Sequence, residues 1–167
     1  SSFHFLHGAV QAGESGMNFP DGTDISEHLP TLYMLAKMSK SVVEFGVRGG
    51  VSTKAIIAAG KPSIHYDISP APFVFNYPHT FIQQSSLEAE IPICDLLFID
   101  TEHTYKQLSR ELATHENMVS KFIAMHDTVT FGSELMPAIE GFLSTNPNWE
   151  IIAHYKNNNG LTVLGRK

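Results

Sequence analysis

The chain has 167 residues, of which 43% are hydrophobic, so it is long enough for one globular domain, residues 1–167, with a buried core. Its formal net charge of -6 and its scattered Lys and Arg residues exclude duplex DNA or RNA as the main partner, because phosphate contacts supply most of that affinity; a small molecule is the expected ligand. A single cysteine, no apolar run of the ~20 residues that a membrane span requires and no basic flank of a secretion signal together indicate a cytoplasmic protein that does not enter membranes.

The N-terminal segment, residues 1–23, is rich in glycine and turn-forming residues and shows no sustained period, which predicts an irregular arm or lid. Asp24 or Ser26 is the candidate N-cap of a helix that runs to about Met38, with Pro30 in its first turn. Apolar residues recur along this helix at helical spacing, so one of its faces should cover a sheet.

From residue 41 onward, short apolar strands alternate with helices. The expected strands are 41–46, 63–68, 79–84, 94–100, 121–127, 149–156 and 161–166, and the expected helices are about 52–59, 105–118 and 133–143. This alternation predicts an α/β fold with a mostly parallel sheet and helices on both faces. The Asn-rich turn at 157–160 should make the last two strands antiparallel.

The stretch VVEFGVRGGVS, residues 42–52, carries the strongest functional signal. Glu44, Gly46 and Gly50 fit an E-x-G-x-x-x-G pattern at a strand-to-helix turn, where glycines let a ligand approach the main chain closely. The dinucleotide fingerprint needs a glycine where this chain has Arg48, which disfavours NAD. The turn resembles motif I of the class I S-adenosylmethionine-dependent methyltransferases, in which it holds the methionine half of the cofactor.

This resemblance implies a Rossmann-like sheet of seven strands in the order 3-2-1-4-5-7-6 and further cofactor contacts at the strand ends. Asp67 would accept hydrogen bonds from the ribose hydroxyls, although it could also simply start the following turn. Ser52 would face the cofactor carboxylate, or serve only as a helix cap. Gln84, Ser85 and Ser86 stand where the family contacts adenine.

Two later stretches, CDLLFIDTEHTY and KFIAMHDT, resemble metal-dependent small-molecule O-methyltransferases, in particular sugar O-methyltransferases and cephalosporin-hydroxylase-like proteins. Asp100, which also borders the cofactor, and Asp127 match the two metal-binding acids of that group, which suit Mg²⁺. His126 would favour a softer ion such as Mn²⁺, Fe²⁺ or Zn²⁺. His103 matches the position of the general base and titrates near neutral pH.

Together these features predict an S-adenosylmethionine-dependent methyltransferase that methylates an oxygen of a small hydroxylated substrate with the help of a divalent metal. One alternative is a hydroxylase-like iron enzyme, for which the sequence lacks a convincing two-His, one-carboxylate spacing. The other is a non-catalytic S-adenosylmethionine-binding module. The acceptor pocket would be closed either by the arm, with Phe19, His28 and the aromatic residues of 73–77 as candidates, or by a second copy of the chain in a homodimer.

Overall fold

The computed structural model describes residues 17–167, and most of the predicted N-terminal arm, residues 1–16, lies outside the described residues. A 3-10 turn, η1 (Ser26–His28), leads directly into helix α2 (Leu29–Lys37), which has Pro30 in its first turn as predicted. The predicted cap at Asp24 or Ser26 is wrong, since neither η1 nor α2 has a side-chain cap. Ser26 Oγ instead accepts a hydrogen bond from Thr23 N, 2.8 Å away, and stabilises the preceding turn.

Within residues 17–167, seven strands form a single sheet in the order β3-β2-β1-β4-β5-β7-β6, which confirms the predicted topology. They are β1 (Val42–Phe45), β2 (Ser63–Asp67), β3 (His79–Gln83), β4 (Cys94–Ile99), β5 (Val119–His126), β6 (Trp149–Tyr155) and β7 (Leu161–Arg166). Strands β1 to β5 are parallel, and β7 is antiparallel to both of its neighbours. The carboxyl ends of β1 to β5 therefore meet at one edge of the sheet, where such folds bind ligands.

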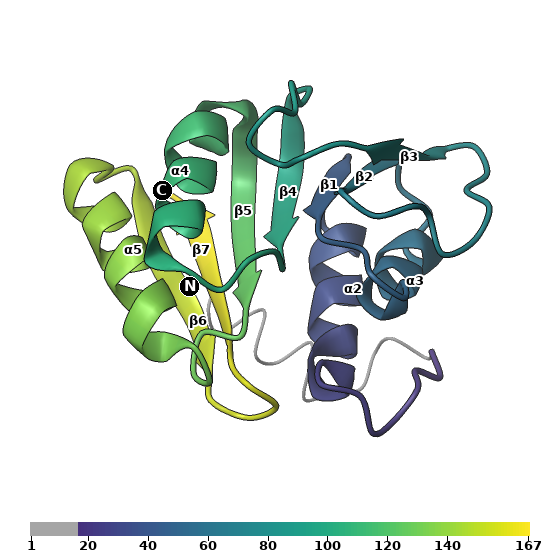
Figure 1. The fold of residues 1–167 in the computed structure, drawn as a ribbon, viewed down its shortest axis with the longest axis horizontal. Helices are drawn as coiled ribbons and strands as arrows, with labels where there is room; N and C mark the ends of the chain where they lie inside the picture. The colour runs from purple at the N-terminus through teal and green to yellow at the C-terminus, as the bar shows by residue number, and fades with distance from the viewer. Residues whose placement is uncertain (1–16) are drawn as a thin grey trace.

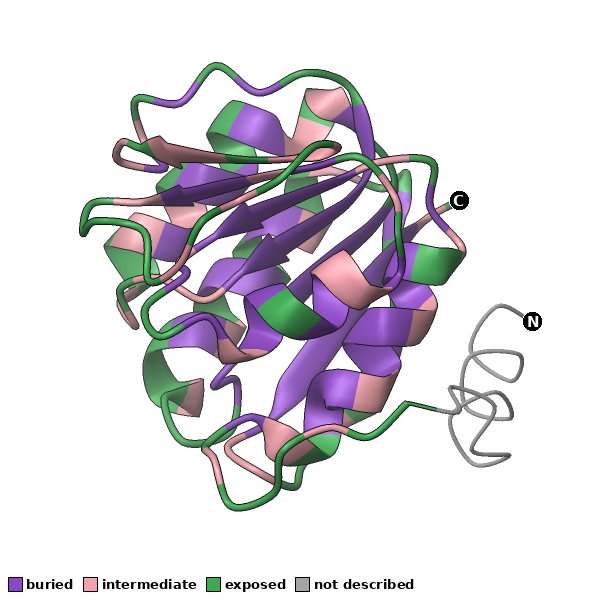
Figure 2. Cartoon of the chain, turned by 90° about the vertical axis from the view of Figure 1, so that its right-hand side faces the viewer, coloured by how far each residue is buried: buried purple, intermediate pink, exposed green. Residues whose placement is uncertain are grey.

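Helices cover both faces of the sheet (Figure 1). α2 and α3 (Val51–Ala58) pack on one face, and α4 (Tyr105–His115) and α5 (Gly132–Thr145) pack on the other. Because successive side chains of a strand point to opposite faces, Val42 belongs to the first core and Val43 to the second. Figure 2 shows the strands as the buried centre of the molecule. Among residues 17–167, no helix is both long enough and apolar enough to span a bilayer.

Most predicted boundaries differ from the structure by one or two residues, and the differences at β5 and α4 have a visible cause. β5 begins at Val119, two residues before the predicted strand. The prediction missed this start because the second and third residues of β5 are exposed and interrupt the apolar run on which it relied. The helix predicted to end at Met118 is α-helical only to His115 and continues as a 3-10 turn, η2 (Glu116–Met118). Neither difference moves a residue at the carboxyl edge of the sheet.

The lone cysteine, Cys94, is buried at the start of β4. Burial, with a smaller contribution from the neighbouring Asp95, raises the pKa of the thiol to about 12, so almost none of it is thiolate at pH 8. We expect Cys94 to react with a disulfide-exchange reagent at pH 8 about 1,000-fold more slowly in the folded protein than in denaturant. Absorbance of the released thiol measures both rates, and equal rates would contradict the prediction.

Candidate functional site

The turn between β1 and α3 is shaped by two glycines in the left-handed region. Gly46 has φ 92° and donates its N–H to Tyr66 O at 2.9 Å. A Cβ atom at Gly46 would collide with the backbone carbonyl of Asp100, and one at Gly50, with φ 84°, would collide with the ring of Phe73. Glycine is therefore required at both positions, by backbone conformation and by close packing.

Beneath this turn lies a buried polar network centred on Glu44. The carboxylate is fully buried and accepts hydrogen bonds from Ser52 Oγ at 2.7 Å and Thr53 Oγ1 at 2.6 Å, and lies 2.7 Å from His65 Nδ1. His65 Nε2 in turn lies 2.7 Å from Ser63 Oγ. Glu44 and Ser52, both predicted to contact the cofactor, thus direct their side chains toward each other under the turn and connect β1, β2 and α3.

A cavity of about 490 Å³ lies at the carboxyl edge of the sheet. It is lined by Gly46, Arg48, Tyr66, Asp67, Ile68, Ser69, Gln84, Ser85, Ser86, Asp100, Thr101, Glu102 and Gln107. Five of the eight predicted cofactor-binding residues are on this wall, namely Gly46, Asp67, Ser85, Ser86 and Asp100. The other three, Glu44, Gly50 and Ser52, are not among the residues that line it and instead form the support of the turn.

Asp67 at the end of β2 holds the glycine turn from the side. Its Oδ2 accepts hydrogen bonds from Val47 N at 2.7 Å and Arg48 N at 2.9 Å, and its Oδ1 accepts one from Ser69 N at 2.9 Å. Burial raises the pKa of Asp67, but these backbone donors outweigh it and hold the pKa below its ordinary value. The carboxylate is therefore ionised at neutral pH. It starts the following turn, as one of the two interpretations held, and it also lines the cavity, where its contact with a ribose stays a prediction.

Three residues of the cavity wall are held by Glu111, a fully buried residue of α4. Glu111 accepts hydrogen bonds from Ser86 Oγ at 2.6 Å, from Thr101 Oγ1 at 2.7 Å and from Gln107 Nε2 at 3.4 Å. Burial raises the pKa of Glu111, and these donors partly oppose that effect. Sequence reasoning missed Gln107, Thr101 and Glu111. The available signal was an acidic residue on the inward, apolar face of a helix.

Four side chains from two neighbouring strand ends meet beside this cavity. His103 Nε2 lies 2.7 Å from Asp127 Oδ2 and 3.5 Å from Asp100 Oδ1. His126 Nδ1 lies 3.2 Å from Asp127 Oδ2 and 3.6 Å from Asp100 Oδ2. The structure thus joins all three predicted metal ligands and the predicted base, His103, in one cluster. We call these four residues the Asp/His cluster.

The orphaned atoms of the Asp/His cluster fit a metal ion. Asp100 Oδ1, His103 Nε2, His126 Nδ1 and Asp127 Oδ2 are buried, and none has a hydrogen-bond partner within residues 17–167. These atoms lie close together, but they are not oriented to form hydrogen bonds with one another. Buried polar atoms are normally hydrogen-bonded, so unpaired atoms that converge in this way have the arrangement of a ligand set for a cation.

The electrostatics of the cluster also call for a cation. Asp100 and Asp127 raise the pKa of His103 to about 9. Burial lowers the pKa of His126, but the same two carboxylates outweigh it and raise that pKa to about 10. In the metal-free protein, protons therefore take the place of a cation at neutral pH. His103 is then protonated in the metal-free protein and must lose this proton before it can act either as a metal ligand or as the predicted general base, so its role as base stays a prediction.

Contacts outside the cluster orient its members. His126 Nε2 lies 3.1 Å from Asn158 O in the β6–β7 turn, which assigns the proton of the neutral ring to Nε2, so that loss of the second proton to a metal would leave the Nδ1 lone pair facing the carboxylates. Asp127 has φ 66°, a rare backbone conformation for a residue other than glycine, and its carbonyl accepts a hydrogen bond from Phe131 N at 2.9 Å. The ring of Phe131 stacks on His103 at 4.2 Å.

The residues proposed to close the acceptor pocket do not line the cavity. His28 is buried, its Nε2 lies 2.8 Å from Asn157 O, and its ring packs edge-on to His126 at 5.8 Å. Phe19 packs against Tyr33, and Phe73 lies against Gly50. These residues are absent from the wall of the nucleoside-sized cavity, and their role in closing the acceptor pocket stays a prediction.

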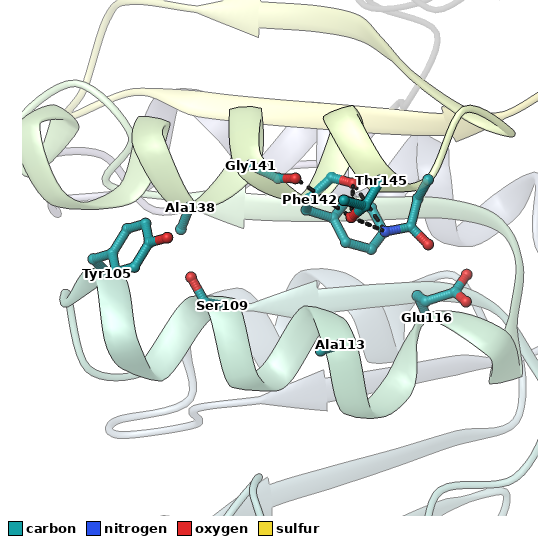
Figure 3. Close-up of a pocket in the computed structure, with 9 residues that line it drawn as sticks. Tyr105, Ser109, Ala113, Glu116, Ala138, Gly141, Phe142 and Thr145 are labelled. Atoms are coloured by element: carbon teal, nitrogen blue, oxygen red, sulfur yellow. Dashed lines mark hydrogen bonds between the residues drawn. The ribbon is translucent and has the colours of Figure 1, made fainter.

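A second cavity, of about 420 Å³, lies between α4 and α5 (Figure 3). Small side chains such as Ser109, Ala113 and Ala138 line it, and Tyr105 stands at one end. Its one acidic residue, Glu116, is hydrogen-bonded to Trp149 Nε1 at 3.1 Å. No residue of the Asp/His cluster lines this second cavity. The candidate functional site is therefore the cavity at the carboxyl edge of the sheet.

No protein-family model matches the sequence, and no curated protein matches it significantly. Solved structures do resemble the fold. The S-adenosylhomocysteine (SAH)-bound Podospora anserina methyltransferase PaMTH1 has a TM-score of 0.68 at 15% identity, over 97% of this chain and 87% of that one. A Bacillus cereus O-methyltransferase in complex with SAH has a TM-score of 0.61 at 12% identity, over 99% and 90%.

The SAH complex of the N-methyltransferase NodS from Bradyrhizobium japonicum has a TM-score of 0.66 at 12% identity, over 98% of this chain and 97% of that one. The names of the last two proteins state different methylated atoms, oxygen and nitrogen, and all three structures resemble the fold of this chain. At such identities the likeness concerns architecture. The chain has the Rossmann-like fold of class I methyltransferases.

Proposed function

We propose that this protein is an S-adenosylmethionine-dependent methyltransferase that transfers a methyl group to an oxygen of a small hydroxylated molecule beside a bound metal ion. The observation that carries the proposal is the double position of Asp100. It lines the 490 Å³ cavity and also belongs to the Asp/His cluster. A nucleoside in the cavity and an acceptor at the cluster would therefore be neighbours, which is the arrangement that a direct group transfer requires.

The cofactor would lie along the wall that runs from Gly46 to Ser86. Gly46 lets the methionine half approach the main chain, and the ionised Asp67 accepts hydrogen bonds from the ribose hydroxyls. Ser85 and Ser86 border the adenine. Glu44, Gly50 and Ser52 act indirectly, because they hold the turn on which these contacts depend. S-adenosylmethionine supplies an electrophilic methyl group on its sulfonium centre.

The metal would be held by Asp100, His103, His126 and Asp127. Two imidazoles with two carboxylates favour a first-row transition ion such as Mn²⁺, Fe²⁺ or Zn²⁺ over Mg²⁺, which prefers oxygen ligands. Such an ion would lower the pKa of a coordinated hydroxyl group, so a weak base would suffice to accept its proton: His103 if it stays outside the ligand set, or a solvent water if it binds the ion. The cluster residues would orient the acceptor oxygen toward the cavity and keep bulk water away, since most of their ligand atoms are buried.

A specific observation also favours the hydroxylase-like alternative. Two histidines and one carboxylate, the ligand combination of many iron oxygenases, lie close together in the fold. They are His103, His126 and Asp127, whose spacing in the sequence did not indicate this proximity. The fourth member, Asp100, reduces the number of open positions that oxygen activation would need. The adjoining nucleoside-sized cavity supports methyl transfer, which remains the leading proposal.

Calorimetric titration with SAH tests the cofactor site. We expect Asp67→Asn to weaken SAH binding about 10- to 100-fold, because one or two charge-assisted hydrogen bonds are lost. Asp21→Asn, an exposed replacement of the same kind, is the matched control and should bind as the wild type does. Unchanged affinity in Asp67→Asn would contradict the assigned ribose contact, and a wild-type protein that does not bind SAH would contradict the proposed function.

Turnover separates the remaining alternatives. Metal-dependent methylation of hydroxylated substrates by labelled S-adenosylmethionine would support the methyltransferase. Oxygen uptake that requires Fe²⁺ and leaves S-adenosylmethionine intact would support the hydroxylase instead. SAH binding without either reaction, across a broad panel of hydroxylated acceptors, would identify a binding module and overturn the catalytic proposal.

A further inference from the structure

We propose that Gln107 recognises the exocyclic amino group of adenine and makes the cavity selective for adenosine over nucleosides that carry a carbonyl at that position. This inference rests on the proposed function, since it assigns the far end of the same cavity. Gln107 lies on the first turn of α4 and lines the cavity together with Ser85 and Ser86. Asp67 lies at the end of β2 on the same wall, so a ribose held there places its base within this enclosure.

The amide of Gln107 is held in one orientation. Its Nε2 donates to Ser86 Oγ at 3.2 Å and to Glu111 Oε2 at 3.4 Å. Glu111 is fully buried and already accepts hydrogen bonds from Ser86 Oγ and Thr101 Oγ1, so a rotated amide would set its carbonyl oxygen against an acceptor. The orientation is therefore fixed by the neighbours of the amide. The atom left for a ligand is Oε1, which has no hydrogen-bond partner among the described residues and is an acceptor.

Ser85 provides the complementary group. Its Oγ accepts a hydrogen bond from Leu87 N at 3.2 Å, which leaves the hydroxyl proton free to donate into the cavity. One acceptor and one donor match the edge of adenine, where an amino group lies beside ring nitrogens that accept. Hypoxanthine carries a carbonyl oxygen in place of the amino group, which would face Gln107 Oε1 with no proton between the two oxygens.

Glu102 is the competing acceptor, because it also lines the cavity. Its side chain is exposed, and no hydrogen bond within residues 17–167 holds it in place. An exposed, unrestrained carboxylate stays solvated and discriminates weakly, whereas an acceptor that is fixed and partly buried loses a hydrogen bond when the ligand cannot donate. The described contacts therefore favour Gln107.

The test compares two ligands that differ only at this position, SAH and S-inosylhomocysteine, by equilibrium binding. The wild type should bind SAH at least about 10-fold more tightly. Gln107→Leu should weaken SAH binding and reduce the preference to less than about 3-fold, because the rejecting oxygen is gone. The matched control is Gln83→Leu on β3, a glutamine whose amide donates to Ile68 O and whose side chain is not on the cavity wall; its preference should equal that of the wild type.

Two further variants test the mechanism of the selectivity. Glu111→Gln should also reduce the preference for SAH, through tighter binding of S-inosylhomocysteine. The Gln107 amide could then rotate and donate to the carbonyl oxygen of the inosine base. Glu102→Gln should leave the preference intact. A preference that survives Gln107→Leu, or that is lost only in Glu102→Gln, would overturn the assignment. A wild type that binds neither ligand would instead overturn the proposed function, so the two failures are distinguishable.

Discussion

Asp127→Asn is expected to weaken the binding of Mn²⁺ by at least about 100-fold and to abolish metal-dependent methyl transfer. Asp127 Oδ2 is the atom closest to both imidazoles of the Asp/His cluster, 2.7 Å from His103 Nε2 and 3.2 Å from His126 Nδ1. Replacing it removes one of two negative charges from the ligand set. Since changes outside the ligand set already cost 10- to 100-fold in affinity, a lost ligand should cost at least the upper end of that range.

Asparagine is the informative replacement because it keeps the shape of Asp127 and tolerates its φ of 66°. The backbone hydrogen bonds of this residue, to Gly160 O and from Phe131 N, are retained. Calorimetry and the electron paramagnetic resonance signal of free Mn²⁺ measure the affinity, with the exposed Asp21→Asn as the control. Wild-type affinity in Asp127→Asn would show that the cluster is not the metal site.

The same titrations separate the two roles considered for His103. As a ligand, His103→Ala should lose metal affinity together with activity. As a free base it would keep the metal affinity and lose only the catalytic rate. The measured affinity therefore decides between the roles without reference to turnover.

Glu44→Ala is expected to lower the free energy of unfolding by about 3–5 kcal/mol, the largest stability effect that we predict. The fully buried carboxylate is the common partner of Ser52 Oγ, Thr53 Oγ1 and His65 Nδ1. Without it these polar atoms remain buried and unpaired, and each costs part of its desolvation energy. The turn that carries Gly46 and Gly50 would lose its support, so SAH binding should weaken as well.

Urea unfolding monitored by circular dichroism measures the loss. Glu150→Ala, on an exposed position of β6, is the matched control and should change stability by less than about 0.5 kcal/mol. A loss below about 1 kcal/mol in Glu44→Ala would mean that Glu44 does not organise the network. In that case its predicted role as a direct cofactor contact would deserve renewed testing by SAH titration.

The α/β class could be predicted from local patterns in the sequence, whereas the order of the strands was implied by the resemblance of the glycine turn to motif I. Short apolar runs alternating with amphipathic helices require a parallel sheet buried on both faces, and the Asn-rich turn fixes the antiparallel last pair. The strand-end position of Asp67, Asp100 and Asp127 also followed from local pattern, because the carboxyl ends of parallel strands share one edge. These three residues do lie at that edge.

Only the tertiary structure decided what each polar side chain at that edge contacts. Glu44 and Ser52 share the motif with Gly46, but strand alternation and the start of α3 direct them toward the buried network instead of the cavity. His103 and His126 are separated by a helix and most of a strand, so no spacing could show that their ring nitrogens converge on the same carboxylates. Gln107 and Glu111 gave no motif at all. Their arrangement depends on how α4 packs against the turn after β3, and contacts between elements far apart in the chain are not encoded in any local pattern.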